Sequence, residues 1–212
     1  MAVLEHLEKL IENYPVLCVC RADIERAYEI LRDTYDRQGM LLVCGNGGSG
    51  ADSEHIVGEL MKEFAIRRPL PKPEQEKLRE LSPENGQILG NHLQGALPAI
   101  TLTSNIALST AFSNDAVPEM VFAQQVYGYG NEKSTLLGIS TSGNSRNVIY
   151  ALETAKVKGM DRIGMTGESG GRMKELCDVC ICVPALSTPD IQELHLPVYH
   201  TLCRMIEEAY FG

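Results

Sequence analysis

The chain opens with two segments in which apolar residues recur three and four positions apart. They cover residues 2–13 and 16–38, and the second contains the run IERAYEILRDTYDRQG. This spacing gathers the apolar side chains on one face of a helix. We therefore predict two N-terminal helices, each with a face suited to packing or to association between subunits.

Beyond Gly39 the pattern changes to short apolar runs that end in small polar residues and are followed by helical spacing. The first such unit reads MLLVCGNGGSGADSEHIVGELMKEF. Three units of this kind occupy residues 40–64, 134–160 and 161–176. Strands that alternate with helices are typical of a parallel sheet, because a crossover helix must return the chain to the same end of the sheet.

Two more apolar runs, at residues 96–103 and 179–184, fit strands, and helical spacing returns over residues 189–210. The total of about five strands predicts a three-layer α/β/α sandwich with a five-stranded parallel sheet of the doubly wound, flavodoxin-like kind. The length fits a single domain over residues 1–212.

Residues 67–95 interrupt this alternation. The stretch reads RRPLPKPEQEKLRELSPENGQ over most of its length, and its only predicted helical part is short and charged. It is too polar to form a core of its own. We interpret it as an insertion beside the functional site and not as a second domain.

Composition and charge narrow the function classes. The formal net charge is -9 at pH 7, and no run rich in Lys or Arg is present, so direct nucleic-acid binding is not expected. The N-terminus lacks the basic and apolar regions of a signal peptide, and no segment is long enough to cross a membrane. We expect a cytoplasmic protein without a membrane segment. The seven cysteines lack paired spacing, which indicates reduced thiols.

The strongest local signal for chemistry is the loop STSGNS at residues 140–145, between a predicted strand and a helix. Hydroxyl groups and free backbone amides gather there at a helix N-terminus, which is a favourable place for an anion. One alternative is that the loop merely caps the helix. A cap needs one such residue, whereas this loop has four hydroxyls in six positions, which favours a phosphate site.

A second loop, GNGGSG at residues 45–50, also follows a strand and opens a helix. Open α/β sheets bind ligands at this end of their strands, so we expect both loops to face one crevice. The glycine spacing is not G-x-G-x-x-G, and this disfavours a dinucleotide site.

His55 and Glu59 lie one helical turn apart and share a face of the helix that follows the glycine loop. They could hold one metal ion together, act as an acid and base, or belong to a solvated helix surface. Their proximity to the glycine loop favours a role in metal binding or acid–base catalysis over a solvated helix surface.

The last predicted helix carries a polar cluster inside an apolar pattern, namely Gln192, Glu193, His195 and His200. Buried polar residues need partners. Gln192 and His200 are eight residues apart, roughly 12 Å along a helix axis. A small ligand shared by them requires both side chains to lean inward or residues from different subunits.

Three segments together carry a family resemblance: GNGGSGADSEHIVGEL, GISTSGNSRNVIYAL and DIQELHLPVYH. In this order they resemble the phosphoheptose isomerases among the SIS (sugar isomerase) domain proteins. ISTSGNS marks SIS domains in general, while His-x-x-x-Glu and Gln-Glu-x-His narrow the resemblance to the phosphoheptose isomerase branch. It covers nearly the whole chain after Gly39.

The resemblance implies an aldose–ketose isomerase that converts sedoheptulose 7-phosphate to D-glycero-D-manno-heptose 7-phosphate through an enediol. It also implies a zinc cofactor and a homotetramer with sites at subunit boundaries. The implied acid–base pair is Glu59 and His200, and the implied zinc ligands are His55, Glu59, Gln192 and His200. The implied substrate-binding residues are Asn46, Gly47, Gly48, Ser49, Asn114, Asp115, Ser140, Thr141, Ser142, Ser145 and Gln192.

Two departures keep other functions open. The family usually has an arginine that faces the substrate where this chain has Glu63, and the insertion is longer than usual. An isomerase of a different phosphosugar is therefore one alternative. Another is a non-catalytic SIS protein that binds a phosphosugar or a protein partner.

Overall fold

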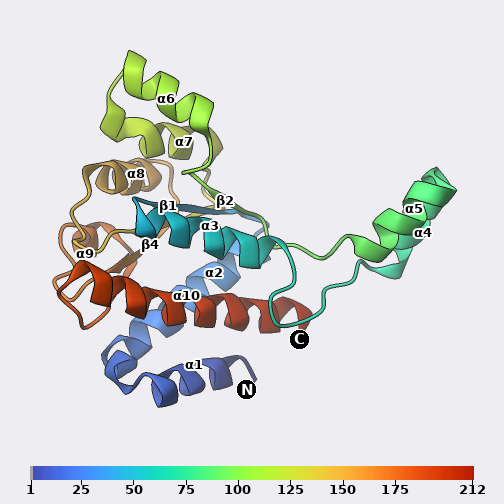
Figure 1. Ribbon diagram of the computed structural model, residues 1–212, viewed down its shortest axis with the longest axis horizontal. Helices are drawn as coiled ribbons and strands as arrows, with labels where there is room; N and C mark the ends of the chain where they lie inside the picture. Colours follow the sequence, from blue (N-terminus) through green and yellow to red (C-terminus); the bar gives the residue numbers. More distant parts are fainter. Residues whose placement is uncertain (1) are drawn as a thin grey trace.

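The computed structural model describes residues 2–212, and within them one sheet of five parallel strands has the order β2-β1-β3-β4-β5. The strands are β1 (Leu41–Gly45), β2 (Ala99–Thr101), β3 (Thr135–Ile139), β4 (Asp161–Thr166) and β5 (Val179–Cys182). The five-stranded parallel sheet predicted from the sequence is confirmed. Helices cover both faces of the sheet, so the three-layer arrangement is confirmed as well (Figure 1).

Side chains alternate between the two faces of the sheet. Val43 and Leu137 pack into one core cluster, and their neighbours Leu42 and Leu136 pack into the other. The helices with buried side chains in the first cluster are α1 (Ala2–Asn13), α2 (Arg21–Asp36) and α10 (Thr188–Phe211), together with α3 (Gly48–Met61) and the 3-10 helix η1 (Pro15–Cys20). The second cluster contains α7 (Val121–Tyr129), α8 (Arg146–Val157) and α9 (Met173–Leu176).

The remaining connection runs from β2 to α7 through α6 (Ile106–Asp115) and the 3-10 helix η2 (Pro118–Met120). No helix within residues 2–212 is long and apolar enough to cross a membrane. All seven cysteines are free thiols.

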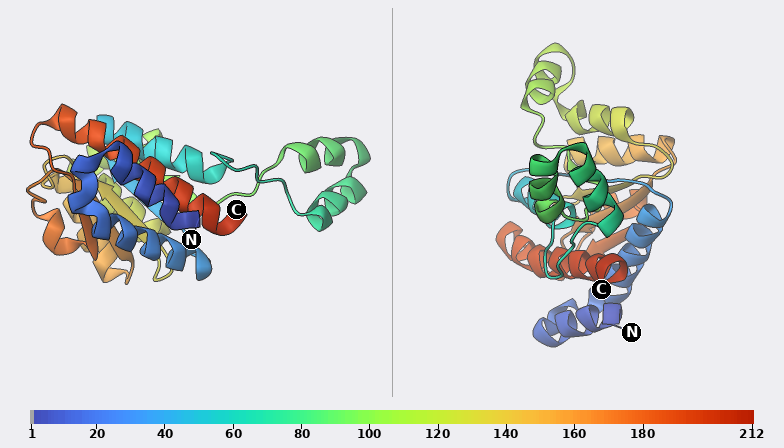
Figure 2. Two further views of the ribbon diagram at one scale, coloured as in Figure 1. Left: turned by 90° about the horizontal axis from the view of Figure 1, so that it is seen from below. Right: turned by 90° about the vertical axis from the view of Figure 1, so that its right-hand side faces the viewer.

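The insertion at residues 67–95 is more regular than its sequence predicts. It forms two helices, α4 (Lys72–Leu81) and α5 (Pro83–His92), which project from the body as a hairpin (Figures 1 and 2). The prediction of only one short helical part was therefore wrong. Gly86 explains the close packing, because a Cβ at this position would lie 2.0 Å from the carbonyl oxygen of Leu78. The base of the hairpin lies beside the end of α3, where the Glu63 backbone amide donates a hydrogen bond to Gln94. The two helices of the hairpin point away from the body (Figure 2).

The helices α3 and α10 lie side by side and run in the same direction (Figure 1). His55 of α3 contacts Tyr199 of α10, and Phe64, just beyond α3, contacts Glu207. The sequence separations of these pairs are 144 and 143 residues. Because the two separations are nearly equal, successive turns of α3 lie opposite successive turns of α10. This pairing determines which side chains of the two helices meet in the candidate active site.

Candidate active site

The glycine loop joins the carboxyl end of β1 to the first turn of α3. Gly47 has φ 55° and ψ -121°, a conformation that favours glycine. Ser49 lies in the first turn of α3 and is buried. The side-chain amide of Gln192 rests against Gly48, since a Cβ there would lie 2.5 Å from Gln192 Nε2. The loop thus brings free backbone amides of a helix N-terminus together with a polar group from α10.

The serine loop joins β3 to α8 in the same way. The hydroxyl groups of Ser140 and Ser145 are 2.9 Å apart, and the backbone amide of Asn144 donates a hydrogen bond to Ser142 Oγ. Ser145 occupies the N-cap position of α8, yet its side chain makes no capping hydrogen bond. The sequence left a simple helix cap as an alternative for this loop. The observed contacts show that the Ser145 hydroxyl points to Ser140 instead.

The two loops meet through Asn46 and Asn147. Their side-chain amides exchange two hydrogen bonds of 2.9 and 2.7 Å. They line a cleft of about 520 Å³, to which Glu54, Thr103 and Ser109 also contribute. Sequence reasoning missed the last three and Asn147, because each lies in a helix or loop whose approach to the cleft depends on the tertiary fold.

Asn114 and Asp115 lie at the end of α6, where both are exposed. Asn114 donates a hydrogen bond of 2.9 Å to the Asp115 carboxylate. They are not among the residues that line the cleft, whereas Ser113 next to them is. A role in substrate binding for the pair therefore stays a prediction.

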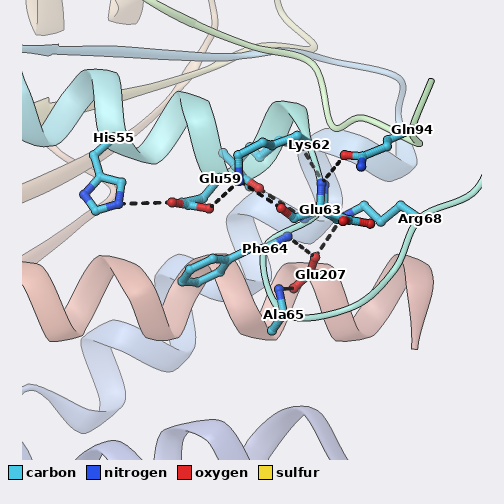
Figure 3. A network of polar contacts seen from close by, with 10 residues as sticks. His55, Glu59, Lys62, Glu63, Phe64, Ala65, Arg68, Gln94 and Glu207 are labelled. Atoms are coloured by element: carbon cyan, nitrogen blue, oxygen red, sulfur yellow. Dashed lines mark hydrogen bonds and ion pairs between the residues drawn. The ribbon is translucent and has the colours of Figure 1, made fainter. Parts of the chain in front are cut away.

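His55 and Glu59 share one face of α3, with 3.1 Å between His55 Nε2 and Glu59 Oε1 (Figure 3). The ammonium group of Lys62 lies 3.5 Å from the other carboxylate oxygen. The Glu59 side chain is 13% exposed. Its carboxylate is therefore held between two nitrogen groups and has little freedom to turn.

His200 reaches the same place from α10. Its ring centroid lies 5.0 Å from that of His55 and 5.3 Å from that of Phe64. Its Nε2 atom is buried and has no hydrogen-bond partner within residues 2–212. Burial, followed by the electrostatic influence of the neighbouring His55 and Arg204 side chains, lowers the pKa of His200 below its ordinary value. A neutral imidazole with an unused ring nitrogen is available to accept a proton or to bind a cation.

Tyr199 extends the network behind His55. Its hydroxyl oxygen lies 3.0 Å from His55 Nδ1 and 3.3 Å from Asp52 Oδ1. Burial and the neighbouring Asp52 carboxylate raise the pKa of Tyr199, so its phenol keeps its proton at neutral pH. The sequence did not single out either residue, because both fit ordinary positions in an amphipathic helix.

The four zinc ligands implied by the resemblance are divided between two places. His55, Glu59 and His200 are neighbours, while Gln192 lies against Gly48, about 10 Å from His55 along the axis of α3. Within residues 2–212, no three His, Cys, Asp or Glu side chains already converge on one metal position. The types of donor and the unpartnered Nε2 of His200 nevertheless fit zinc, with Gln192 as the ligand that would have to move.

A buried ion pair lies at the C-terminal end of α3, next to the site. Arg68 Nε lies 2.8 Å from Glu207 Oε1, and both side chains are fully buried. Arg68 also donates to the carbonyl oxygens of Leu60 and Glu59, so it caps the last turn of α3 (Figure 3). This contact fixes the backbone of Glu59 relative to α10.

Comparisons with known proteins identify the family and agree with the fold. Residues 78–167 match the family model described as the SIS domain. A phosphoheptose isomerase of Nitratiruptor sp. is 39% identical over 98% of this chain and 100% of its own length. One of Akkermansia muciniphila is 35% identical over 95% of this chain and 93% of its own length. A solved structure of a phosphoheptose isomerase from Francisella tularensis has a TM-score of 0.76 and 30% identity, over 98% of this chain and 97% of that one.

The fold and the two loops thus define a SIS-domain protein of the sugar-phosphate isomerase class. The chain belongs to the phosphoheptose isomerase family.

Proposed function

We propose that this protein isomerises sedoheptulose 7-phosphate to D-glycero-D-manno-heptose 7-phosphate. The observation that carries the proposal is the Glu59 carboxylate, which is held between His55 and Lys62 beside the unpartnered Nε2 of His200. His55 and Glu59 lie on α3, whose N-terminus opens at the glycine loop, and His200 lies on α10. Relatives of similar length that are named phosphoheptose isomerase support the same reaction.

The phosphate is assigned to the serine and glycine loops. The hydroxyl groups of Ser140 and Ser145, Ser49 and the free amides at the two helix N-termini supply neutral donors for its oxygens. His55 follows Ser49 by six residues, about 9 Å along α3. A long sugar chain suits this separation between the phosphate site and the acid–base groups better than a short one.

The reaction needs one proton to move between two carbons. Glu59 accepts a proton from C1 of the ketose and delivers a proton to C2, so that an enediol is the intermediate; the proton on the carboxyl group can exchange with solvent between the two steps. The neutral imidazole of His200 moves the hydroxyl proton from O1 to O2, which keeps the exchange balanced. General acid–base catalysis of this kind contributes about 10²–10⁴-fold to a rate.

We assign zinc to His55, Glu59, Gln192 and His200. Imidazole, carboxylate and amide oxygen are ligands that zinc accepts. Because Gln192 rests against Gly48, it would have to lean toward the other three or be supplied by a neighbouring subunit. When bound, zinc supplies a Lewis acid that polarises the oxygen atoms at C1 and C2. Glu59 serves as ligand and as base at different stages, because a metal-bound carboxylate is a weaker base.

A second candidate is an isomerase that acts on a different phosphosugar. Its support is Glu63, whose backbone amide is fixed by a hydrogen bond to Gln94 at the base of the hairpin. An acidic side chain at this position disfavours a sugar that carries another negative group nearby. Two exposed cations lie at this end of the site: Lys62 donates a hydrogen bond to the Glu63 carbonyl oxygen, and Arg204 stacks on Phe64.

A cytoplasmic homotetramer is part of the proposal. Exposed apolar side chains on the N-terminal helices, among them Val16 and Val19, support association between subunits. Residues from neighbouring subunits would complete sites that a single chain leaves open. Sedimentation velocity or light scattering measures the assembly directly.

The experiment is turnover of sedoheptulose 7-phosphate by the purified protein, before and after a chelator and again after zinc is restored. Loss of turnover with the chelator and recovery with zinc support the proposal. Turnover of only another ketose phosphate supports the second candidate. A protein that turns over no phosphosugar, yet melts at a higher temperature when one is present, contradicts both and is a binding protein.

A further inference from the structure

Glu54 is an exposed carboxylate in the cleft beside the glycine loop, and the proposed reaction gives it no role. It directly precedes His55 on α3, so the cleft and the acid–base groups occupy adjoining faces of one helix. Thr103, just beyond β2, donates a hydrogen bond of 2.9 Å to Glu54 Oε1. The carboxylate is therefore held in the cleft from the side of the sheet.

A chain of hydroxyl groups supports this contact from below. The hydroxyl oxygens of Thr103 and Thr101 are 2.8 Å apart, and those of Thr101 and Ser53 are also 2.8 Å apart. Ser53 is fully buried and Thr101 is 8% exposed. These contacts fix one oxygen of Glu54, while its Oε2 accepts no hydrogen bond from another side chain within residues 2–212. The free oxygen is thus available to a ligand in the cleft.

The wall of the cleft selects against a second anionic group. Within residues 2–212 it contains no lysine, arginine or histidine, and Glu54 is its one carboxylate. Its volume of about 520 Å³ is that of a small-molecule site. Amide, hydroxyl and apolar side chains make up much of the rest, among them Asn46, Ser109, Ser113, Val121, Phe122 and Asn147. Such a wall suits the hydroxyl groups and C–H surfaces of a sugar, whereas the carboxylate repels a phosphate group.

We propose that Glu54 is a specificity-determining residue that binds hydroxyl groups in the middle of the sugar chain through Oε2. The substrate class is then a monophosphate with several uncharged hydroxyl groups between its phosphate and its reacting carbons. Ser49 precedes Glu54 by five residues, about 7.5 Å along α3, so a phosphate on the loops needs several carbons to reach it. The inference rests on the proposed function, because it takes the loops as the phosphate site.

A purely structural role for Glu54 predicts a different result. If Glu54 only ties α3 to the end of β2, its removal changes stability and alters the affinities of all ligands alike. The chain offers a matched control in Asp36, another exposed carboxylate that accepts a hydrogen bond from a hydroxyl group, that of Tyr210 at 2.7 Å. Asp36 ends α2 and does not line the cleft.

The test measures binding to the full-length protein by isothermal titration calorimetry with three probes: sedoheptulose 7-phosphate, dihydroxyacetone phosphate and inorganic phosphate. Glu54→Ala is expected to weaken binding of the seven-carbon sugar about 10–100-fold, the loss for hydrogen bonds to a charged group. Binding of the two short probes should not change, because neither reaches Glu54. Asp36→Ala should leave all three affinities unchanged, and circular dichroism identifies any variant that fails to fold.

Variants of Thr103 test how the carboxylate is held. Thr103→Val removes the hydroxyl group that fixes Glu54, and it is expected to weaken binding of sedoheptulose 7-phosphate less than Glu54→Ala does. Thr103→Ser keeps the hydroxyl group and is expected to bind like the wild type.

The outcomes separate this inference from the proposed reaction. Equal losses for all three probes in Glu54→Ala, or no loss for sedoheptulose 7-phosphate, overturn the inference. A wild type that binds this sugar phosphate no more tightly than inorganic phosphate overturns it as well. A selective loss in Glu54→Ala, together with a wild type that does not turn the sugar over, overturns the proposed reaction and leaves the binding role of Glu54 standing.

Discussion

The guanidinium group of Arg68 and the carboxylate of Glu207 form an ion pair that is closed to solvent, with 2.8 Å between Nε and Oε1. The same carboxylate accepts a hydrogen bond of 2.8 Å from the backbone amide of Phe64, just beyond α3. Arg68 in turn holds the carbonyl oxygen of Leu60. The pair therefore ties together the end of α3, the helix α10 and the base of the projecting hairpin.

Arg68→Met is expected to destabilise the protein by about 3–5 kcal/mol, because it leaves the Glu207 carboxylate buried without its partner cation. Urea unfolding followed by circular dichroism measures the change. The control is Arg26→Ala, which removes an exposed ion pair with Glu29 and is expected to leave the free energy of unfolding nearly unchanged. Equal losses in the two variants would contradict this view of the buried pair.

Ser145 and Ser187 are both N-cap residues, but only one of them caps its helix. The Ser187 side chain accepts a hydrogen bond from the backbone amide of Asp190, whereas the Ser145 hydroxyl bonds Ser140. Ser187→Ala is expected to cost about 0.5–2 kcal/mol of stability without changing KM. Ser145→Ala is expected to raise KM for the phosphosugar and to leave the free energy of unfolding nearly unchanged. The reverse pattern would make the serine loop a cap and not a phosphate site.

His195 is fully buried, and burial lowers its pKa to about 4 from an ordinary value of 6.5. Between these values the unfolded chain binds more protons than the folded one, so stability is complete above pH 6.5 and is lost as the pH falls toward 4. Between pH 7 and 5 this group alone should cost the wild type about 2 kcal/mol.

His195→Gln should remove that part of the pH dependence, as measured by urea unfolding at the two pH values. Replacement of His92, an exposed histidine in the hairpin, is the control and should leave the pH dependence as it is in the wild type. If His195→Gln loses as much stability as the wild type on acidification, the imidazole is not buried in its neutral form.

The hairpin should be dispensable for folding of the body. No side chain of α4 is buried, and the buried positions of α5 are Gly86 and Gly90. A short Gly-Ser linker in place of residues 72–92 should change the free energy of unfolding by less than about 1 kcal/mol, because loop length has only a weak effect on stability. A loss of several kcal/mol on urea unfolding would mean that the hairpin packs on the body or on another copy.

The strands of the sheet could be predicted from the sequence because a parallel sheet buried on both faces leaves apolar runs, such as residues 41–45 and 135–139. The second helix of the insertion could not. The segment PENGQILGNH has proline, glycine and asparagine, which favour turns over helix, and it is helical because Gly86 lets it pack closely on Leu78.

Contacts within one helix of the site could be predicted from the sequence, whereas contacts between α3 and α10 could not. Residue spacing placed His55 and Glu59 on one face of a helix, and the observed contact follows from that spacing. The contacts of Tyr199 and Glu207 depend on how α3 and α10 lie against each other, which one helix pattern does not contain. The position of the Gln192 side chain could not be predicted for the same reason: its amide rests on the glycine loop and not beside His200.

The central claim is that Glu59 transfers the proton between C1 and C2 of a ketose phosphate. The most direct test follows sedoheptulose 7-phosphate by NMR in D2O with the wild type and with Glu59→Gln, an isosteric change that removes the base. The account predicts an aldose product with deuterium at C2 from the wild type, and turnover reduced at least about 10²-fold in the variant although the sugar phosphate still binds. Turnover in the variant at the wild-type rate would contradict it. An aldose from the wild type that carries no deuterium at C2, as a direct hydride shift between the two carbons gives, would also contradict it.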